Sequence, residues 1–150
     1  MPEETTFRIA KPDGLREFVM IVDDDALVTL LVERVLTTEG YRVITASDGC
    51  EALRTYKRFK SQIHLVILDY KMPDMDGYTL FNELRNVNPN VPAVLTSGFV
   101  EQEELDVMLA NGLRGFIPKP LTQQKLLSKV RTLLDEIAHG TRLPSGPVEE

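Results

Sequence analysis

The 150-residue sequence contains one cysteine and no tryptophan. A lone Cys50 has no partner for an internal disulfide and no second cysteine for a zinc site, so both are poor interpretations. No apolar run approaches the roughly 20 residues that span a bilayer, and the start of the chain, Met1-Pro2-Glu3-Glu4, lacks the basic and apolar regions of a secretion signal. We therefore expect a cytoplasmic protein with no membrane contact.

Basic residues are also scarce. The chain has 17 Lys and Arg against 23 Asp and Glu, a formal net charge of −6, which disfavours direct binding of nucleic acid. Its length and its 43% hydrophobic content suit one domain with a single core. We expect an N-terminal extension at 1–16, a domain at 17–139 and a flexible C-terminal tail at 140–150, because Pro and Gly punctuate both ends.

Short apolar runs alternate with amphipathic segments along the domain. The runs are expected strands at 18–22, 41–45, 63–68, 93–96 and 115–117. The first and third are almost continuously apolar, as in central parallel strands covered on both faces, whereas the second alternates and fits an edge. Segments such as 26–39 repeat apolar residues at helical spacing, so the pattern predicts a parallel sheet with helices on both faces.

Polar side chains follow four of the five expected strands. Parallel strands end at one edge of a sheet, and open α/β sheets bind ligands at that edge, so these side chains are expected to gather there. They are Asp23, Asp24 and Asp25 after the first run, Asp69 after the third, Ser97 after the fourth and Lys119 after the fifth.

The acids in this set predict a cation site. Asp25 is explained as the N-cap of the next helix, but Asp23, Asp24 and Asp69 follow buried strands and must find a cation or stay hydrated. Carboxylates that converge repel one another. Mg²⁺ relieves that repulsion, because it takes oxygen ligands and often a phosphate besides.

Each polar residue taken alone has a plainer explanation. Residues 23–25 fit a helix start, Asp74 and Asp76 fit a turn, Ser97 fits a strand-end hydroxyl bonded to the backbone, and Lys119 fits a surface lysine. An acid pair, a single acid, a hydroxyl and a lysine nevertheless follow four successive inner strands in that order. This joint pattern favours phosphoryl chemistry on a carboxylate.

Four motifs resemble the receiver domain of two-component response regulators, over about residues 18–138. They are Val22-Asp23-Asp24-Asp25, the run from Val66 to Gly77, the run from Val91 to Gly98, and Gly115-Phe116-Ile117-Pro118-Lys119-Pro120. In this order and spacing they are specific. The resemblance implies a flavodoxin-like α/β fold, a doubly wound five-stranded parallel sheet of order 2-1-3-4-5 flanked by five helices.

By that resemblance, Asp69 accepts a phosphoryl group from a phosphohistidine on a sensor kinase. The family's Mg²⁺ would be held by Asp24, Asp69 and the backbone carbonyl of Lys71, with Asp23 acting mainly through water. Lys119 would pair with the Asp69 carboxylate and then with the phosphoryl group.

The resemblance also assigns a switch. The Ser97 hydroxyl would move to hydrogen-bond the phosphoryl group, and Phe116 stands at the family's aromatic switch position, where plain core packing is a competing explanation. Lys71 and Phe99 occupy positions that influence how quickly the phosphoryl group is lost. The family usually has a cis bond after the active-site lysine, so we expect one at Lys119-Pro120.

The expected function is therefore a bacterial signalling receiver that catalyses only its own phosphorylation and dephosphorylation. A sensor histidine kinase or phosphotransfer protein would supply the phosphoryl group. The fourth helix, fifth strand and fifth helix, about residues 101–137, would then contact an unknown downstream protein or a second copy in a phosphorylation-dependent homodimer. Because only residues 140–150 follow the last expected helix, we expect no output domain in this chain.

Three other functions compete with this one. A haloacid-dehalogenase-type phosphatase needs a second acid where the chain has Lys71, and Thr or Val where it has Pro73. A nucleotide-binding module needs a glycine-rich phosphate loop of a kind the chain lacks. A receiver-like scaffold that acts without phosphorylation is the stronger rival, although the acids, Ser97 and Lys119 are all present.

Overall fold

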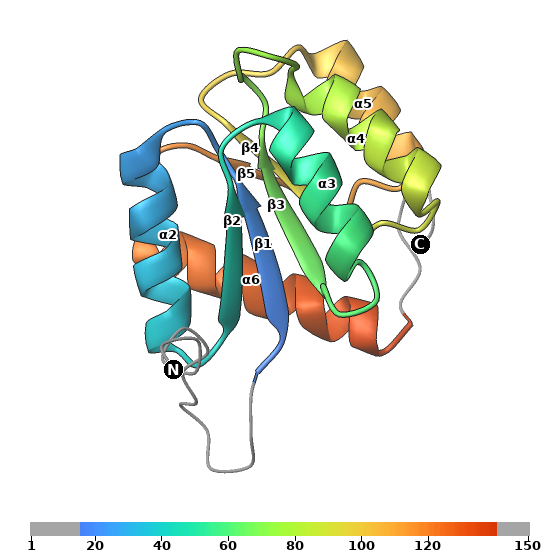
Figure 1. Ribbon diagram of the computed structural model, residues 1–150. Coiled ribbons are helices and arrows are strands. Elements are labelled where there is room, and N and C mark those ends of the chain that lie inside the picture. The colour runs from blue at the N-terminus through green and yellow to red at the C-terminus, as the bar shows by residue number, and fades with distance from the viewer. Residues whose placement is uncertain (1–15, 141–150) are drawn as a thin grey trace.

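The computed structural model describes residues 16–140, in which five strands alternate with five helices (Figure 1). The strands are β1 (Phe18–Val22), β2 (Arg42–Ala46), β3 (Leu65–Asp69), β4 (Ala93–Ser97) and β5 (Phe116–Pro118). The helices are α2 (Ala26–Thr38), α3 (Gly49–Phe59), α4 (Gly77–Val87), α5 (Gln102–Ala110) and α6 (Gln123–Ala138). Apart from residues 16 and 140, the expected extension and tail lie outside the described residues. In the described range no helix is long and apolar enough to cross a membrane.

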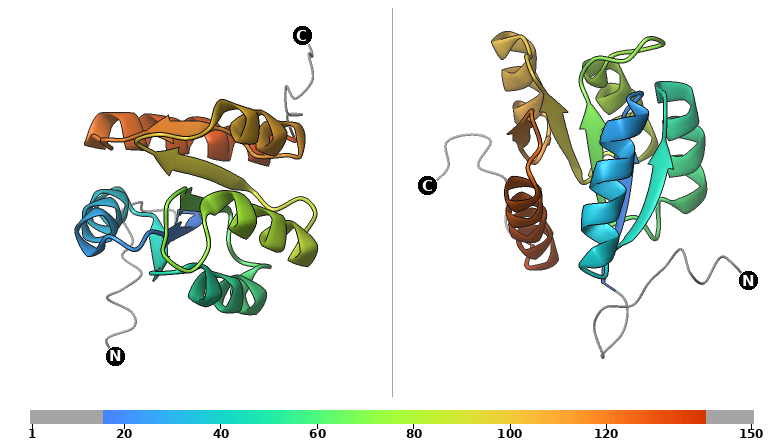
Figure 2. Two further views of the ribbon diagram at one scale, coloured as in Figure 1. Left: turned by 90° about the horizontal axis from the view of Figure 1, so that it is seen from above. Right: turned by 90° about the vertical axis from the view of Figure 1, so that its left-hand side faces the viewer.

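The five strands form one parallel sheet of order β2-β1-β3-β4-β5, which confirms the expected topology. Strand β2 lies at an edge, as its alternating pattern predicted, whereas the expectation of an inner position for the fifth strand is wrong, because β5 forms the other edge. The register brings the strand ends together: Val22 aligns with both Ala46 and Leu68, and Asp69 aligns with Thr96. The residues that follow the strands therefore meet at the carboxyl edge, the end on which the left view of Figure 2 looks down.

Two apolar cores sandwich the sheet, since side chains alternate between its faces. On one face, Met20, Val66 and Leu95 pack with α3, α4 and α5. On the other, Ile21, Ile67 and the buried stripes of α2 and α6 pack together. All five residues of β1, of β3 and of β4 are buried, which explains why these runs carry almost no polar residue before their ends.

Helix starts at the carboxyl edge are fixed by side-chain caps. Asp25, Asp48, Asp76 and Thr122 each accept hydrogen bonds from backbone N–H groups in the first turn of the helix that follows. These caps set where α2, α3, α4 and α6 begin, and hence how the loops between strand and helix run over the edge.

Strand β1 has the expected bounds, and the other strand boundaries differ from the sequence-based ones by one or two residues. The largest difference is in β3, which begins at Leu65 instead of residue 63. His64 lies just before the strand, and its ring Nδ1 accepts the Phe18 N–H at 3.0 Å. The His64 ring thus takes the place of a backbone carbonyl as the acceptor for the Phe18 N–H. Apolar periodicity does not predict such a side-chain contact.

Candidate functional site

Three carboxylates gather at the carboxyl edge, as the strand ends predicted. Asp23, Asp24 and Asp69 each offer one oxygen, and these oxygens lie within 4.8 Å of one another. Asp23 and Asp69 are buried, with 4% and 5% of their surface exposed, while Asp24 is exposed. Hard carboxylate oxygens this close, with one open to solvent, fit the ligand preferences of Mg²⁺.

Lys119 bridges two of these carboxylates. Its Nζ lies 3.0 Å from Asp23 Oδ2 and 3.0 Å from Asp69 Oδ1. Burial alone would lower the pKa of Lys119, but its hydrogen bonds to Asp69 and Asp23 outweigh that effect and raise the pKa, so the amine stays protonated. The sequence predicted the pairing with Asp69 but not the equal contact with Asp23.

The surroundings of Asp69 change its pKa. Burial raises its pKa to about 6, the hydrogen bond from Lys119 opposes this shift, and the neighbouring charge of Asp23 adds to it. At neutral pH the Asp69 carboxyl is therefore mostly ionised, although burial opposes its charge. A cation bound by the cluster favours the carboxylate form, because an opposite charge stabilises the ionised state.

The backbone after β1 holds Asp23 in place. The Asp23 Oδ1 accepts the Asp25 N–H at 2.9 Å, and the Asp23 carbonyl accepts the Thr29 hydroxyl at 3.3 Å. Asp25 in turn caps α2. The interpretation of Asp25 as a helix cap is therefore correct. Of the three consecutive acids, Asp25 caps α2, and Asp23 and Asp24 belong to the acidic cluster.

The remaining predicted residues do not belong to the acidic cluster. The Ser97 hydroxyl donates to the Phe99 carbonyl and accepts the Phe99 N–H, so it is engaged with its own loop. Phe99 is 64% exposed, and Lys71 is exposed as well. Phe116 is half-buried and packs against the core that α3, α4 and α5 cover. The cis bond expected at Lys119-Pro120 is present.

The loop after β3 is anchored at Asp74, a contact that the sequence did not predict. The Asp74 carboxylate accepts the N–H groups of Gly49 and Cys50 at 3.0 Å each, and that of Met75 at 2.9 Å. The first two belong to the first turn of α3, whose unpaired N–H groups favour an anion. The sequence interpreted Asp74 only as a turn residue, because nothing local indicates that α3 begins beside it.

Gly77 starts α4 against the site. A Cβ at this position would lie 2.7 Å from the Asp69 carbonyl oxygen and 2.9 Å from the Tyr70 Cα. The Gly77 N–H also donates to the Tyr70 carbonyl at 2.6 Å. Only a glycine allows α4 to approach the end of β3 this closely.

Tyr70 connects the site to α5, a second contact that the sequence did not predict. The residue directly follows Asp69, is buried, and donates its hydroxyl to the Glu104 carboxylate. That hydrogen bond raises the pKa of Tyr70 to about 12. The partners are 34 residues apart, so no sequence pattern could have paired them.

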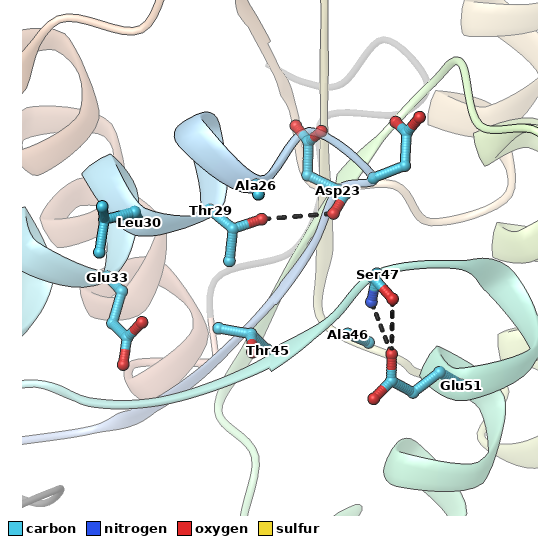
Figure 3. Close-up of a pocket in the computed structure, with 10 residues that line it drawn as sticks. Asp23, Ala26, Thr29, Leu30, Glu33, Thr45, Ala46, Ser47 and Glu51 are labelled. Atoms are coloured by element: carbon cyan, nitrogen blue, oxygen red, sulfur yellow. Dashed lines mark hydrogen bonds between the residues drawn. The ribbon is translucent and has the colours of Figure 1, made fainter.

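A cavity of about 490 Å³ opens beside the cluster, between α2, β2 and the start of α3 (Figure 3). Asp23 and Asp24 form part of its wall, together with Glu33 and Glu51. Glu51 is already occupied, since it accepts the backbone N–H and the hydroxyl of Ser47 at 2.8 and 3.0 Å. The cavity gives small molecules and ions access to the Asp24 side of the cluster.

Comparisons with known proteins agree with this geometry. A family model described as the response regulator receiver domain matches residues 19–131. The chain is 34% identical over 125 residues to the chemotaxis protein CheY of Treponema pallidum, covering 83% of this chain and 87% of that protein. It is 33% identical over 118 residues to the sensor kinase CckA of Brucella abortus, covering 79% of this chain but only 12% of the kinase.

A solved structure is similar as well. The CheX-CheY-BeF3-Mg²⁺ complex from Borrelia burgdorferi contains a chain that matches with a TM-score of 0.76 and 32% identity, covering 83% of this chain and 94% of that one. The curated matches thus range from nearly a whole protein to a small part of a larger one.

Proposed function

Because this chain belongs to the response regulator receiver family of two-component signalling, we propose that it is a phosphorylation-dependent switch whose phosphoacceptor is Asp69. Receiver domains are signalling domains and not conventional enzymes, so the chemistry proposed is limited to the chain's own phosphorylation and dephosphorylation. One observation carries the proposal. The buried Asp69 carboxylate has an ammonium 3.0 Å away and two more carboxylates close by.

In the proposed transfer, an Asp69 carboxylate oxygen attacks the phosphorus of a phosphohistidine. The P–N bond breaks, its electron pair stays on the imidazole nitrogen, and the product is an acyl phosphate on Asp69. Lys119 keeps its positive charge beside the reacting oxygens and pairs with the phosphoryl group once it is attached. Its contact with Asp23 holds the ammonium at the cluster before transfer.

Asp24, Asp69 and the backbone carbonyl of Lys71 would hold the Mg²⁺ ion, with Asp23 acting mainly through water. When bound, Mg²⁺ neutralises negative charge on the phosphoryl oxygens during in-line transfer. The chain's own part is to bring the carboxylates within 4.8 Å of one another and to leave Asp24 open to solvent. The Asp74 anchor and the close approach at Gly77 fix the loop that carries Lys71.

The response to phosphorylation would start at Ser97 and Phe116. Ser97 must release the Phe99 backbone to reach the phosphoryl group. One hydrogen bond to a charged group contributes about 1.5 to 3 kcal/mol, whereas moving a two-state equilibrium from 1:99 to 99:1 takes about 5.5 kcal/mol. Ser97 alone is therefore insufficient, and Lys119 pairing and Phe116 repacking must contribute to shift the surface formed by α5, β5 and α6.

The proposed donor is a sensor histidine kinase or phosphotransfer protein. The similarity of this chain to part of a sensor kinase supports such a donor, because receiver sequences occur within kinases. The surface formed by α5, β5 and α6 would contact a downstream protein, or a second copy in a homodimer.

The proposal is tested with Mg²⁺ and a small phosphodonor such as acetyl phosphate. We expect an adduct that is cleaved by base and by hydroxylamine and that increases the mass of the chain by one phosphoryl group, and we expect Asp69→Asn to abolish it. Asp106→Asn, a change of the same kind on exposed α5, serves as the control and should leave the adduct intact. An unmodified wild-type chain would instead support the scaffold that acts without phosphorylation.

A further inference from the structure

Lys125 occupies an unfavourable position on α6. It is the third residue of the helix, and its N–H donates to the cap hydroxyl of Thr122 at 3.1 Å. The first turn of a helix carries partial positive charge, so acids are favoured there and a lysine is disfavoured. The first turn of α6 contains no acid that would compensate the charge. A residue that breaks a local rule often serves another part of the molecule.

The ammonium of Lys125 turns back over the loop between β5 and α6. Its Nζ donates to the Pro118 carbonyl at 3.1 Å and to the Pro120 carbonyl at 3.0 Å. These two carbonyls flank Lys119 on either side. One side chain thus holds the backbone immediately before and immediately after the lysine that contacts Asp69.

The two prolines explain why a side chain is needed for this task. Proline has no N–H, so this stretch of backbone offers carbonyls but few donors. The one donor between the prolines, the Lys119 N–H, bonds to the Ser97 carbonyl at 2.8 Å. That bond holds Lys119 toward β4, and the two Lys125 bonds hold the carbonyls around it toward α6.

We propose that Lys125 is a positioning residue for Lys119. By fixing the backbone on both sides, it directs the Lys119 ammonium to the point 3.0 Å from both Asp23 and Asp69. The inference rests on the proposed function, in which the Lys119 ammonium at this point binds the phosphoryl group. Lys125 itself does not touch the reacting atoms.

The test compares Lys125→Met with Lys129→Met, which removes the same charge one turn further along α6. Affinity for the phosphoryl mimic beryllofluoride is measured in the presence of Mg²⁺, and affinity for Mg²⁺ is measured separately, both by calorimetry. We expect Lys125→Met to weaken beryllofluoride binding about three- to tenfold, the scale of one partly exposed charge-assisted hydrogen bond, with Mg²⁺ affinity unchanged within about twofold. Lys129→Met should bind both as the wild type does.

Two further measurements and one further variant separate positioning from simpler roles. A loss caused only by net charge is screened by salt, so the effect of Lys125→Met should persist at about 0.5 M salt. The amide of Lys119 should exchange its hydrogen faster in Lys125→Met, because the surrounding backbone is less restrained. Lys125→Arg keeps a charge that can reach the carbonyls and should restore most of the affinity.

The possible results have distinct meanings. The positioning role is overturned if Lys125→Met binds beryllofluoride as tightly as the wild type, or if both Met variants lose the same amount of beryllofluoride affinity. It is also overturned if the loss in Lys125→Met disappears at high salt, or if Mg²⁺ affinity and stability fall in parallel with it. A wild-type chain that binds Mg²⁺ but neither beryllofluoride nor a phosphoryl group would overturn the proposed function itself.

Discussion

At the scale of single residues, the site is a balance of charges around Asp69. Three carboxylates gather beside one ammonium, which contacts Asp23 and Asp69 but not Asp24 in the ion pairs of the site, so negative charge exceeds positive charge there. Burial and the charge of Asp23 keep the pKa of Asp69 near 6. Phe99, which we propose influences how long a phosphoryl group survives, is 64% exposed.

Phe99 is expected to shield the phosphoryl group from water. Phe99 follows Ser97 by two residues, and its side chain is 64% exposed on the loop after β4. Once Ser97 has released the Phe99 backbone, this ring would cover the phosphoryl group. We predict that Phe99→Ala speeds loss of phosphate about two- to fivefold, equivalent to about 0.4 to 1 kcal/mol of barrier. Release of inorganic phosphate from the purified phosphorylated chain measures this.

Val107→Ala is the control for this prediction. Val107 is an exposed apolar residue on α5, 43% exposed, so its removal tests whether any loss of exposed apolar surface speeds hydrolysis. A phosphate lifetime in Phe99→Ala equal to that of the wild type would contradict the shielding role.

At the scale of helices and strands, the site depends on how closely its neighbours approach. Helix α4 meets the end of β3 at Gly77, and α5 is bonded to the same end through Tyr70 and Glu104. One element of the proposed signalling surface, α5, is therefore bonded to the residue next to the proposed phosphoacceptor.

Gly77→Ala is predicted to destabilise the fold by about 1 to 3 kcal/mol, although alanine is the better helix former. The added methyl would meet the Asp69 carbonyl, the Tyr70 backbone and the Leu95 side chain, all within 2.9 Å, so α4 must move. Urea unfolding measures the free energy. Gly98→Ala is the matched control, since a Cβ there meets nothing within 4 Å, and its stability should stay near that of the wild type.

Tyr70→Phe is predicted to lower stability by about 0.5 to 1.5 kcal/mol, the usual contribution of one hydrogen bond. The pKa of Tyr70 rises from 10.0 to about 12 on folding, so the contribution is complete below pH 10 and is lost as pH rises toward 12. Urea unfolding at pH 8 and at pH 11.5 should show the difference between the two chains shrinking at the higher pH. Tyr78→Phe, on α4, controls for loss of a hydroxyl, and a pH-independent difference would contradict the assignment.

The elements themselves were largely predictable, for a physical reason. Residues 18–22 and 65–69 are buried on both faces, so their sequences must be apolar up to the point where each strand ends. The polar residues that follow then mark one sheet edge. Asp23, Asp24, Asp69 and Lys119 were identified in this way, and the structure brings them together.

The contacts between elements were not predictable in the same way. Asp74 with the start of α3, Tyr70 with Glu104, and Lys125 with the carbonyls around Lys119 all depend on how loops cross the edge. Local patterns set the period and the ends of an element, but they carry no information on which loop lies above which helix. For this reason the sequence predicts for Asp74 only a place in a turn.

At the scale of the whole molecule, a polar cluster joins segments far apart in the sequence. Arg131 on α6 donates to Glu17 Oε2 at 2.8 Å and to the Tyr41 hydroxyl at 3.0 Å. Glu17 directly precedes β1 and Tyr41 directly precedes β2. The cluster thus connects the last helix to the entry points of two strands, which lie at the end of the sheet opposite the acidic site.

Glu17→Gln is predicted to reduce stability by about 0.5 to 1 kcal/mol at neutral pH, a modest amount because the ion pair is partly exposed to solvent. Burial alone would raise the pKa of Glu17, but the hydrogen bond and charge of Arg131 help to outweigh it and lower the pKa below the ordinary 4.5. The contribution is therefore present above about pH 4.5 and is lost as pH falls through the lowered pKa.

Denaturant unfolding of both chains between pH 3 and pH 7 tests this dependence. The difference in unfolding free energy should narrow below pH 4.5 and remain constant above pH 6. Glu83→Gln, an exposed residue on α4, should show little difference at any pH. A gap that widens on acidification would contradict the ion-pair assignment.

The contact of Lys119 with Asp23 spans 96 residues, almost the whole domain. During synthesis, the acids of β1 and β3 are made well before the lysine that follows β5. A growing chain that lacks β5 therefore has the proposed phosphoacceptor but not Lys119, the cation proposed to pair with the phosphoryl group. The chain would then be able to signal only after β5 has joined the sheet. Unfinished chains, and chains truncated before β5, would not signal.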